Sequence, residues 1–179
     1  FSIKKNTHNL IIGENGSGKS TLIGLLNGVY KPNNGTIKIF TDKFSYVGPI
    51  PLIFEDTLKN NLLYGVETKI KDSNLIDEVI KYQIFEDFSE GILEQQISSK
   101  TLSSGQMQKV SIIRAFLRDP DILFLDEATS NLDIRSIDLV SKELTKFSGT
   151  IINITHKMNQ FPEADNIFKI EDKLIKYIS

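Results

Sequence analysis

The chain has 179 residues, of which 40% are hydrophobic and 25% are charged, an ordinary composition for a globular protein with one sizeable core. Its formal net charge of −2 gives no polybasic surface for nucleic acid or anionic lipid, so we expect no nucleic-acid partner. The sequence contains no cysteine, which excludes disulfides, zinc–thiolate sites and thiol catalysis, and no apolar run approaches the roughly 20 residues that span a bilayer.

The first part of the chain predicts short strands and one helix. Residues 10–12 form an apolar run typical of a buried strand, and residues 21–26 predict a helix after the intervening loop. Residues 37–40 read I-K-I-F and alternate like a strand, bounded by the turn-forming sequence N-N-G. Residues 44–47 predict another short strand.

The middle of the chain changes to a helical periodicity, over about residues 54–117. Residues 103–117 within it predict a helix with a serine at its N-cap. The last part predicts a strand at 121–126, a helix at 134–147, a strand at 151–154 and a hairpin from 167–170 and 174–178. Strand–helix alternation at both ends predicts an α/β fold with a largely parallel sheet, and the helical middle predicts an inserted subdomain.

Residues 13–21 read G-E-N-G-S-G-K-S-T and match the phosphate-binding pattern G-x-x-x-x-G-K-[ST] at every fixed position. Glycines let such a loop direct several backbone N–H groups at one anion, and the helix that follows adds its positive end. Lys19 can reach the outer phosphates, and the Ser20 hydroxyl can hold Mg²⁺. A glycine-rich turn without a ligand is the alternative, but the strand–loop–helix context favours a nucleoside triphosphate. The predicted ATP-binding residues are Gly13, Glu14, Asn15, Gly16, Ser17, Gly18, Lys19, Ser20 and Thr21.

Asp126 and Glu127 follow four apolar residues. An acid at the end of a buried strand beside a phosphate loop can hold the Mg²⁺ shell. Glu127 is then placed to polarise a water against the γ-phosphate. The alternative is a helix N-cap or a surface pair, which the upstream phosphate loop disfavours.

Three further features fit the same kind of site. Residues 102–106 read L-S-S-G-Q just before a predicted helix, where serine hydroxyls and N–H groups make a second anion site, although a serine cap alone would explain them. Residues 130–133 read S-N-L-D, which is also the pattern of an ordinary turn that caps the next helix. His156 follows the strand at 151–154, at the edge where ligands bind in such sheets, although a lone histidine is more often a bystander.

Together these motifs resemble the nucleotide-binding domain of an ABC transporter, and the resemblance covers essentially the whole chain. Residues 13–21 resemble the Walker A motif, and residues 122–127 resemble Walker B with its catalytic glutamate. Residues 102–106 resemble the signature L-S-G-G-Q, with a serine in place of the first glycine. Residues 130–133 resemble the D-loop, and His156 resembles the switch histidine.

The resemblance implies a P-loop NTPase fold, which is a RecA-like core with a mainly parallel sheet, an inserted α-helical subdomain and a small antiparallel β part. It implies a single ABC ATPase domain over residues 1–179, with the core at about 1–53 and 119–179 and the helical subdomain at about 54–118.

The resemblance also implies that a head-to-tail pair of such domains binds and hydrolyses ATP with Mg²⁺. Ser20 and Asp126 would position Mg²⁺, Glu127 would act as general base, and His156 would contact the γ-phosphate. The residues implied to act across the pair are Ser103, Ser104, Gly105 and Gln106 at the partner's ATP, and Asp133 in the D-loop.

Residues 54–62 read F-E-D-T-L-K-N-N-L and resemble the exporter segment F-x-x-T-I-x-x-N-I. This likeness implies export of an unidentified substrate, with the chain as the C-terminal part of a longer polypeptide that carries transmembrane domains. The domain would lie on the cytoplasmic face of a membrane, with the cell membrane as the expected one, beside an identical or different second ABC domain. The alternatives are a non-transport ABC ATPase and a degenerate ATP-binding regulatory half with weak hydrolysis.

One position departs from the exporter pattern in a way that bears on the chemistry. Pro49 occupies the position of a glutamine that in the family contacts Mg²⁺ or the attacking water, and proline has no side-chain donor or acceptor. Either a water replaces this contact, or hydrolysis and coupling are weakened. The family's adenine-stacking aromatic lies upstream of Walker A, and Phe1 is too late in the sequence to be that residue.

Overall fold

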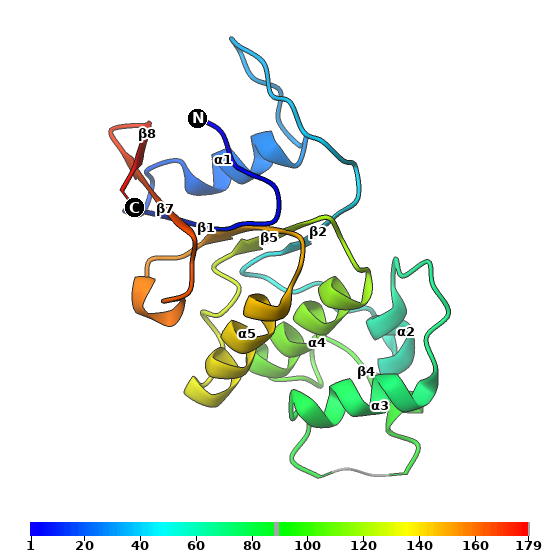
Figure 1. Cartoon of the computed structure of the whole chain (residues 1–179). Helices are drawn as coiled ribbons and strands as arrows, with labels where there is room; N and C mark the ends of the chain where they lie inside the picture. Colours follow the sequence, from blue (N-terminus) through cyan, green and yellow to red (C-terminus); the bar gives the residue numbers. More distant parts are fainter. Residues whose placement is uncertain (88–89, 179) are drawn as a thin grey trace. The chain divides into compact units, whose positions relative to one another are not determined.

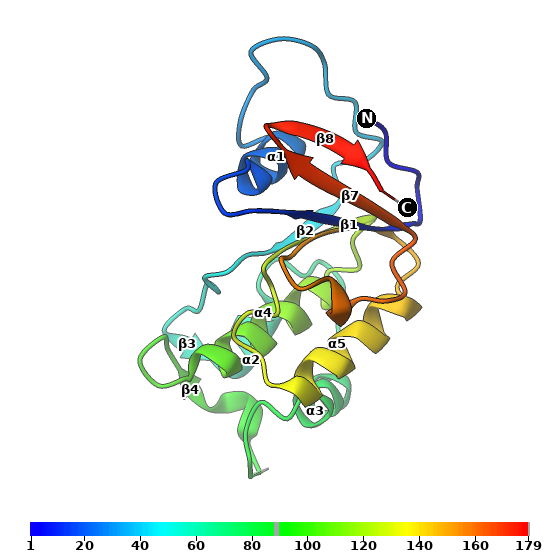
Figure 2. The ribbon, with the colours of Figure 1, turned by 90° about the vertical axis from the view of Figure 1, so that its left-hand side faces the viewer.

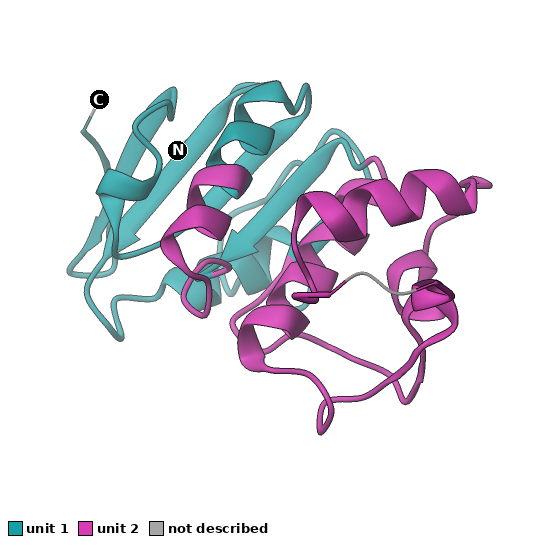
Figure 3. Cartoon of the chain, turned by 90° about the horizontal axis from the view of Figure 1, so that it is seen from below, with its two compact units in different colours: residues 1–46, 120–127, 140–179 teal, residues 47–119, 128–139 magenta. Residues whose placement is uncertain are grey.

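The computed structural model describes residues 1–87 and 90–178 of the chain (Figure 1). The chain divides into two compact units, which Figure 3 shows in different colours. Unit 1 comprises residues 1–46, 120–127 and 140–179, and unit 2 comprises residues 47–119 and 128–139. The domain boundaries expected from the sequence, near residues 53 and 118, stay a prediction.

Unit 1 is built on a six-stranded sheet. Its strands are β1 (His8–Gly13), β2 (Phe44–Val47), β5 (Ile122–Asp126), β6 (Thr150–Ile154), β7 (Asn166–Glu171) and β8 (Leu174–Tyr177), in the spatial order β2-β5-β6-β1-β7-β8. β1 pairs in parallel with β6 and β7, and β5 pairs in parallel with β6. β8 returns antiparallel to β7, and Figure 2 shows these two strands side by side. The mainly parallel sheet and the closing hairpin that the sequence predicts are confirmed.

Helix α1 (Lys19–Leu26) joins the core of unit 1 through Ile23. The buried cluster combines this helix with side chains from four strands, β1, β5, β6 and β7, and its members are Ile11, Ile23, Ile122, Phe124, Ile152, Ile154, Phe168 and Ile170. β5 and β6 are buried along their whole length, as expected of near-continuous apolar runs in a parallel sheet. The loops that leave their carboxyl ends therefore start from a rigid base.

The prediction of a strand at residues 37–40 is wrong. These residues have no regular secondary structure, and the side chains of Ile37, Ile39 and Phe40 are exposed. A strand needs a neighbour to pair its backbone N–H and C=O groups. In the part of the chain that the structure describes, the sheets contain no strand paired with this segment. The alternation is present in the sequence but forms no ladder.

Unit 2 is mainly helical. It contains α2 (Leu58–Leu63), α3 (Asp72–Lys81), α4 (Ser104–Leu117) and a 3₁₀ turn at Ile92–Glu94, while α5 (Ile134–Lys146) begins in unit 2 and ends in unit 1. An antiparallel pair, β3 (Asp56–Thr57) with β4 (Gln96–Ile97), interrupts the region that the sequence predicts as helical. Among residues 1–87 and 90–178, no helix is both long and apolar enough to cross a membrane.

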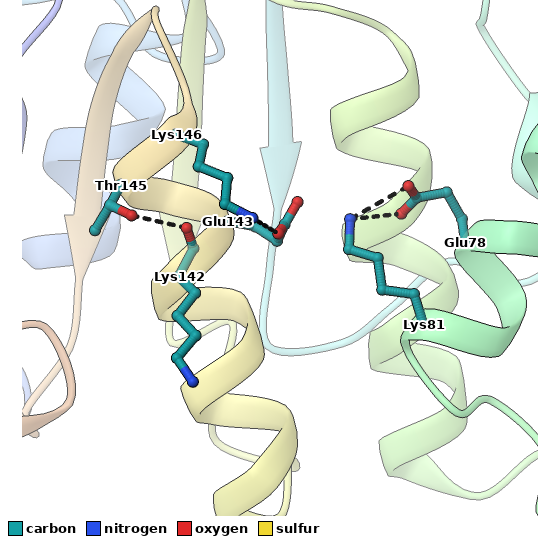
Figure 4. Close-up of polar contacts among 6 residues, drawn as sticks. All are labelled: Glu78, Lys81, Lys142, Glu143, Thr145 and Lys146. Carbon is teal, nitrogen blue, oxygen red and sulfur yellow. Dashed lines mark hydrogen bonds and ion pairs between the residues drawn. The ribbon is translucent and has the colours of Figure 1, made fainter.

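Ion pairs three residues apart stabilise single turns of α3 and α5 (Figure 4). Lys81 Nζ lies 3.3 Å from Glu78 Oε1, and Lys146 Nζ lies 2.9 Å from Glu143 Oε1. Such pairs on helix surfaces contribute about 0.2–0.5 kcal/mol each. They support the helices locally and have no part in the site described next.

Candidate ATP-binding site

The phosphate loop joins β1 to α1 in unit 1. β1 ends at Gly13, and α1 begins at Lys19 with Gly18 as its N-cap. Gly16 and Gly18 have φ of 81° and 106°, in the left-handed region where a side chain is strained, so both positions favour glycine. A Cβ at Gly13 would lie 2.8 Å from the carbonyl oxygen of Ile170, so glycine is also required where β7 approaches the loop. The loop therefore has the backbone geometry that directs N–H groups toward an anion.

Lys19 is held over this loop by the loop's own backbone. Its side chain is almost fully buried, and Nζ donates to the carbonyl oxygens of Gly13 and Glu14, each at 2.8 Å. An ammonium has three N–H donors, so these two bonds fix its position and leave a third for a phosphate oxygen. The predicted role of Lys19 at the outer phosphates fits this geometry.

Asp126 lies at the end of β5, beside Ser20 of α1. Asp126 as a residue is 5% exposed. Burial raises the pKa of its carboxyl group, and a hydrogen bond from the Ser20 hydroxyl opposes the shift. Hydroxyl and carboxylate oxygens are ligands that Mg²⁺ prefers, and Mg²⁺ commonly takes its remaining ligands from phosphate and water. The structure thus brings the two predicted metal ligands together. No cluster of three or more His, Cys, Asp or Glu side chains suited to a metal ion occurs in the described residues.

Glu127 and His156 follow neighbouring parallel strands, in which Asp126 is in register with Ile154. His156 Nδ1 lies 3.0 Å from Glu127 Oε2 and 3.1 Å from Oε1. The backbone of Glu127 has a φ of 51°, which is uncommon for a residue with a side chain, and its N–H donates to the Ile154 carbonyl oxygen at 2.9 Å. A strained backbone of this kind persists where the surrounding structure fixes it, and it often marks a functional site.

A cavity of about 260 Å³ lies between the loop and the acidic pair. Its lining consists of Asn15, Gly16, Gly18, Lys19, Ser20, Thr21, Asp126 and Glu127. The remaining loop residues shape the turn; for example, the N–H of Ser17 donates to the carbonyl oxygen of Glu14 at 3.2 Å. Eight of the predicted ATP-site residues therefore face one space within unit 1, with donors for phosphate on one side and carboxylates on the other.

The predicted partner-site residues lie at the start of α4 in unit 2. Ser103 is the N-cap: its hydroxyl accepts from the Gln106 N–H at 3.2 Å, while Gln106 Oε1 accepts from the Ser103 N–H at 2.8 Å. Ser104 is exposed, and a Cβ at Gly105 would lie 3.1 Å from the carbonyl oxygen of Asn131. The local capping box therefore accounts for two of these side chains, and contact with a partner's ATP stays a prediction.

Asp133 caps α5, which agrees with the simpler of the two interpretations that the sequence left open. Its carboxylate accepts from the N–H of Ser136 at 2.9 Å and from the Ser136 hydroxyl at 2.8 Å. These hydrogen bonds lower the pKa of Asp133, and Lys109 Nζ lies 3.8 Å from the same carboxylate. Because Lys109 belongs to α4, this ion pair connects the predicted D-loop to the signature helix within unit 2.

Sequence reasoning missed the groups that hold the backbone around Pro49. Gln108 Nε2 donates to the carbonyl oxygen of Gly48 at 3.2 Å, and Asn131 Nδ2 donates to that of Pro49 at 3.4 Å. Pro49 has no side-chain hydrogen-bonding group, but its backbone carbonyl oxygen accepts a hydrogen bond from Asn131 of the predicted D-loop. Gln108 is fully buried, and no local pattern in the sequence distinguishes it from the other polar residues at the start of α4.

A second missed residue is Arg114, which is buried in α4. Its Nε donates to the carbonyl oxygen of Asn61 at 2.6 Å, and Nη1 donates to that of Leu52 at 2.8 Å. Burial lowers the pKa of Arg114 to about 10. The arginine thus ties α4 to α2 and to the segment before β3. An arginine within the apolar run I-I-R-A-F was the available signal.

The phosphate loop, the acidic end of β5 and the serine-capped start of α4 define an ATP-binding domain of the ABC type. The family model described as ABC transporter matches residues 1–130, and the chain belongs to this family. Membership makes the chain an ATPase domain of the transporter type.

Relatives of known name differ in how much of their length the chain spans. The chain is 34% identical over 186 residues to the ABC multidrug transporter mdr2 of Aspergillus fumigatus. This match covers 93% of this chain and 23% of that protein. It is 36% identical over 186 residues to the ATP-dependent permease MDL1 of Candida albicans, covering 92% of this chain and 27% of that protein. It is 32% identical over 194 residues to the energy-coupling factor transporter ATP-binding protein EcfA1 of Mycoplasma genitalium, covering 98% of this chain and 70% of that protein.

Proposed function

We propose that this domain binds and hydrolyses Mg²⁺-ATP to drive the export of a substrate through transmembrane domains. The observation that carries the proposal is the contact between His156 and Glu127. Glu127 lines the same cavity as Lys19 and Asp126. A carboxylate oriented by an imidazole beside a phosphate site can accept a proton from an attacking water.

Each group has a distinct part in this proposal. The N–H groups of the loop and the Lys19 ammonium bind the β- and γ-phosphates. Ser20 and Asp126 hold Mg²⁺, which neutralises charge on the same phosphates when it is bound. Glu127 takes the proton of the water, and His156 holds Glu127 and contacts the γ-phosphate.

The proposal extends to the partners of this domain. The relatives mdr2 and MDL1 are named as a multidrug transporter and a permease, and the chain matches about a quarter of each. This coverage supports a domain of a longer polypeptide with transmembrane domains, located on the cytoplasmic face of a membrane. A second ABC domain would place the start of its α4, with Ser103 to Gln106, against the ATP bound in unit 1.

The test is phosphate release by the purified full-length protein and its Glu127→Gln variant. General-base catalysis contributes roughly 100- to 10,000-fold, so turnover should fall by that order while ATP still binds. The matched control is Glu67→Gln, which neutralises an exposed carboxylate in unit 2 and should leave turnover unchanged.

Equal turnover for the parent protein and Glu127→Gln would overturn the role of Glu127. If both were nearly inactive while binding ATP, the domain would instead be a degenerate regulatory half. Pro49 is the observation that favours this second function, because it removes a side-chain contact to Mg²⁺ or water.

A further inference from the structure

Tyr46 lies beside the metal-binding carboxylate but outside every motif of the sequence. Its hydroxyl oxygen is 3.5 Å from Asp126 Oδ2. β2 neighbours β5 in the sheet, and the Lys43 carbonyl oxygen accepts from the N–H groups of Asp121 and Ile122. Tyr46 and Asp126 follow shortly after these residues in the sequence. The placement of β2 next to β5 therefore brings the phenol to the end of β5.

The Asp126 carboxylate receives donors from two sides. Ser20 donates from the first turn of α1, and Tyr46 donates from β2. An ionised carboxylate is an acceptor only, so two donors from different elements fix the rotation of its plane. Hydrogen bonds of this kind orient metal ligands and set their affinity for the metal.

We propose that Tyr46 is a positioning residue for Mg²⁺, acting through Asp126, an inference that rests on the proposed function. The phenol holds Oδ2 so that the carboxylate presents an oxygen to the metal beside Ser20. The Tyr46 hydroxyl is thus the contribution of β2 to the proposed metal site.

The test removes only this hydroxyl, in the Tyr46→Phe variant of the full-length protein. Mn²⁺ replaces Mg²⁺ as the probe, and its affinity for the ATP-bound protein is measured by electron paramagnetic resonance. Loss of a group that orients a metal ligand costs about 10- to 100-fold in metal affinity. We expect about 3- to 10-fold here, because the 3.5 Å contact is long and the tyrosine side chain is partly exposed.

Two further measurements separate positioning from packing. Affinity for a fluorescent ATP analogue in excess EDTA should be unchanged in Tyr46→Phe, since the phosphate loop is intact. ATP turnover should be lower at limiting Mg²⁺ and recover at saturating Mg²⁺. The matched control is Tyr177→Phe, which removes an exposed phenol from β8 and should alter none of these values.

Unchanged Mn²⁺ affinity in Tyr46→Phe would overturn the inference and leave the proposed function standing. An equal loss of ATP analogue affinity in EDTA would also overturn it, because the phenol would then support the fold rather than the metal ligand. Failure of the parent protein to bind Mn²⁺ with ATP would instead overturn the proposed function, and this inference with it.

Discussion

The two units present their predicted site residues in opposite ways. In unit 1, Lys19 and Asp126 come from separate parts of the sequence and line one cavity with Glu127, which His156 contacts from the next strand. In unit 2, the side chains of Ser103 and Gln106 each accept a hydrogen bond from the backbone N–H of the other residue, within the first turn of one helix. A parallel sheet assembles a site from its strand ends. A helix cap is complete within one turn, so its side chains meet through local hydrogen bonds.

The comparison separates effects on ligand binding from effects on folding. Substitutions at the unit 1 site should change ATP binding or hydrolysis more than stability. Substitutions at the start of α4 should change the stability of unit 2, and hydrolysis only through a partner domain. The predictions below test this separation in order of decreasing effect.

The largest effect is expected for Lys19→Ala. Hydrogen bonds from a charged donor contribute about 1.5–3 kcal/mol, so ATP affinity should fall roughly 100-fold. The measurement is the dissociation constant for ATP with Mg²⁺ in the full-length protein. Lys31→Ala is the matched control, since Lys31 is an exposed lysine of the same unit. An affinity of Lys19→Ala close to that of the parent would contradict the binding role of the phosphate loop.

Much of unit 1 could be predicted from the sequence because its signals are local. The loop at residues 13–21 needs glycines at fixed spacing, and Gly16 and Gly18 have the positive φ that explains them. The apolar runs before Gly13 and Asp126 are short and bounded, which identifies them as buried strands.

The rest depends on contacts between distant segments, which no local pattern contains. Residues 37–40 alternate like a strand, yet a strand also requires a partner, and none pairs with them in the described sheets. Tyr46 reads as an ordinary strand residue, and only the placement of β2 next to β5 brings its hydroxyl to Asp126. Arg114 likewise has its acceptors more than 50 positions earlier, at Asn61 and Leu52.

An intermediate effect is expected when pH changes the charge of His8 in β1. Burial lowers the pKa of His8 to about 4, with Asp165 opposing the shift, so the folded state favours the neutral ring. Its contribution to stability is therefore complete above about pH 6.5 and is lost as pH falls toward 4. Between pH 7 and 4.5 this loss is about 2 kcal/mol.

Urea unfolding of the parent and of His8→Gln at the two pH values measures this difference. The glutamine variant lacks the titrating ring, so its stability should fall less on acidification than that of the parent. Parallel losses in the two proteins would mean that other groups carry the acid sensitivity and that His8 is not held neutral by its burial.

The smallest effect, and the one that bears most directly on unit 2, is expected for Ser103→Ala. Loss of an N-cap costs about 1 kcal/mol, which lowers the melting temperature of a domain of this size by roughly 2–4 °C. Ser104→Ala is the matched control, because Ser104 is exposed at the next position and is not the cap. Differential scanning calorimetry should show a fall for Ser103→Ala and none for Ser104→Ala, with ATP affinity at the unit 1 loop unchanged in both. A loss of ATP affinity in Ser103→Ala as large as that in Lys19→Ala would break the comparison, since the start of α4 would then bind nucleotide without a second domain.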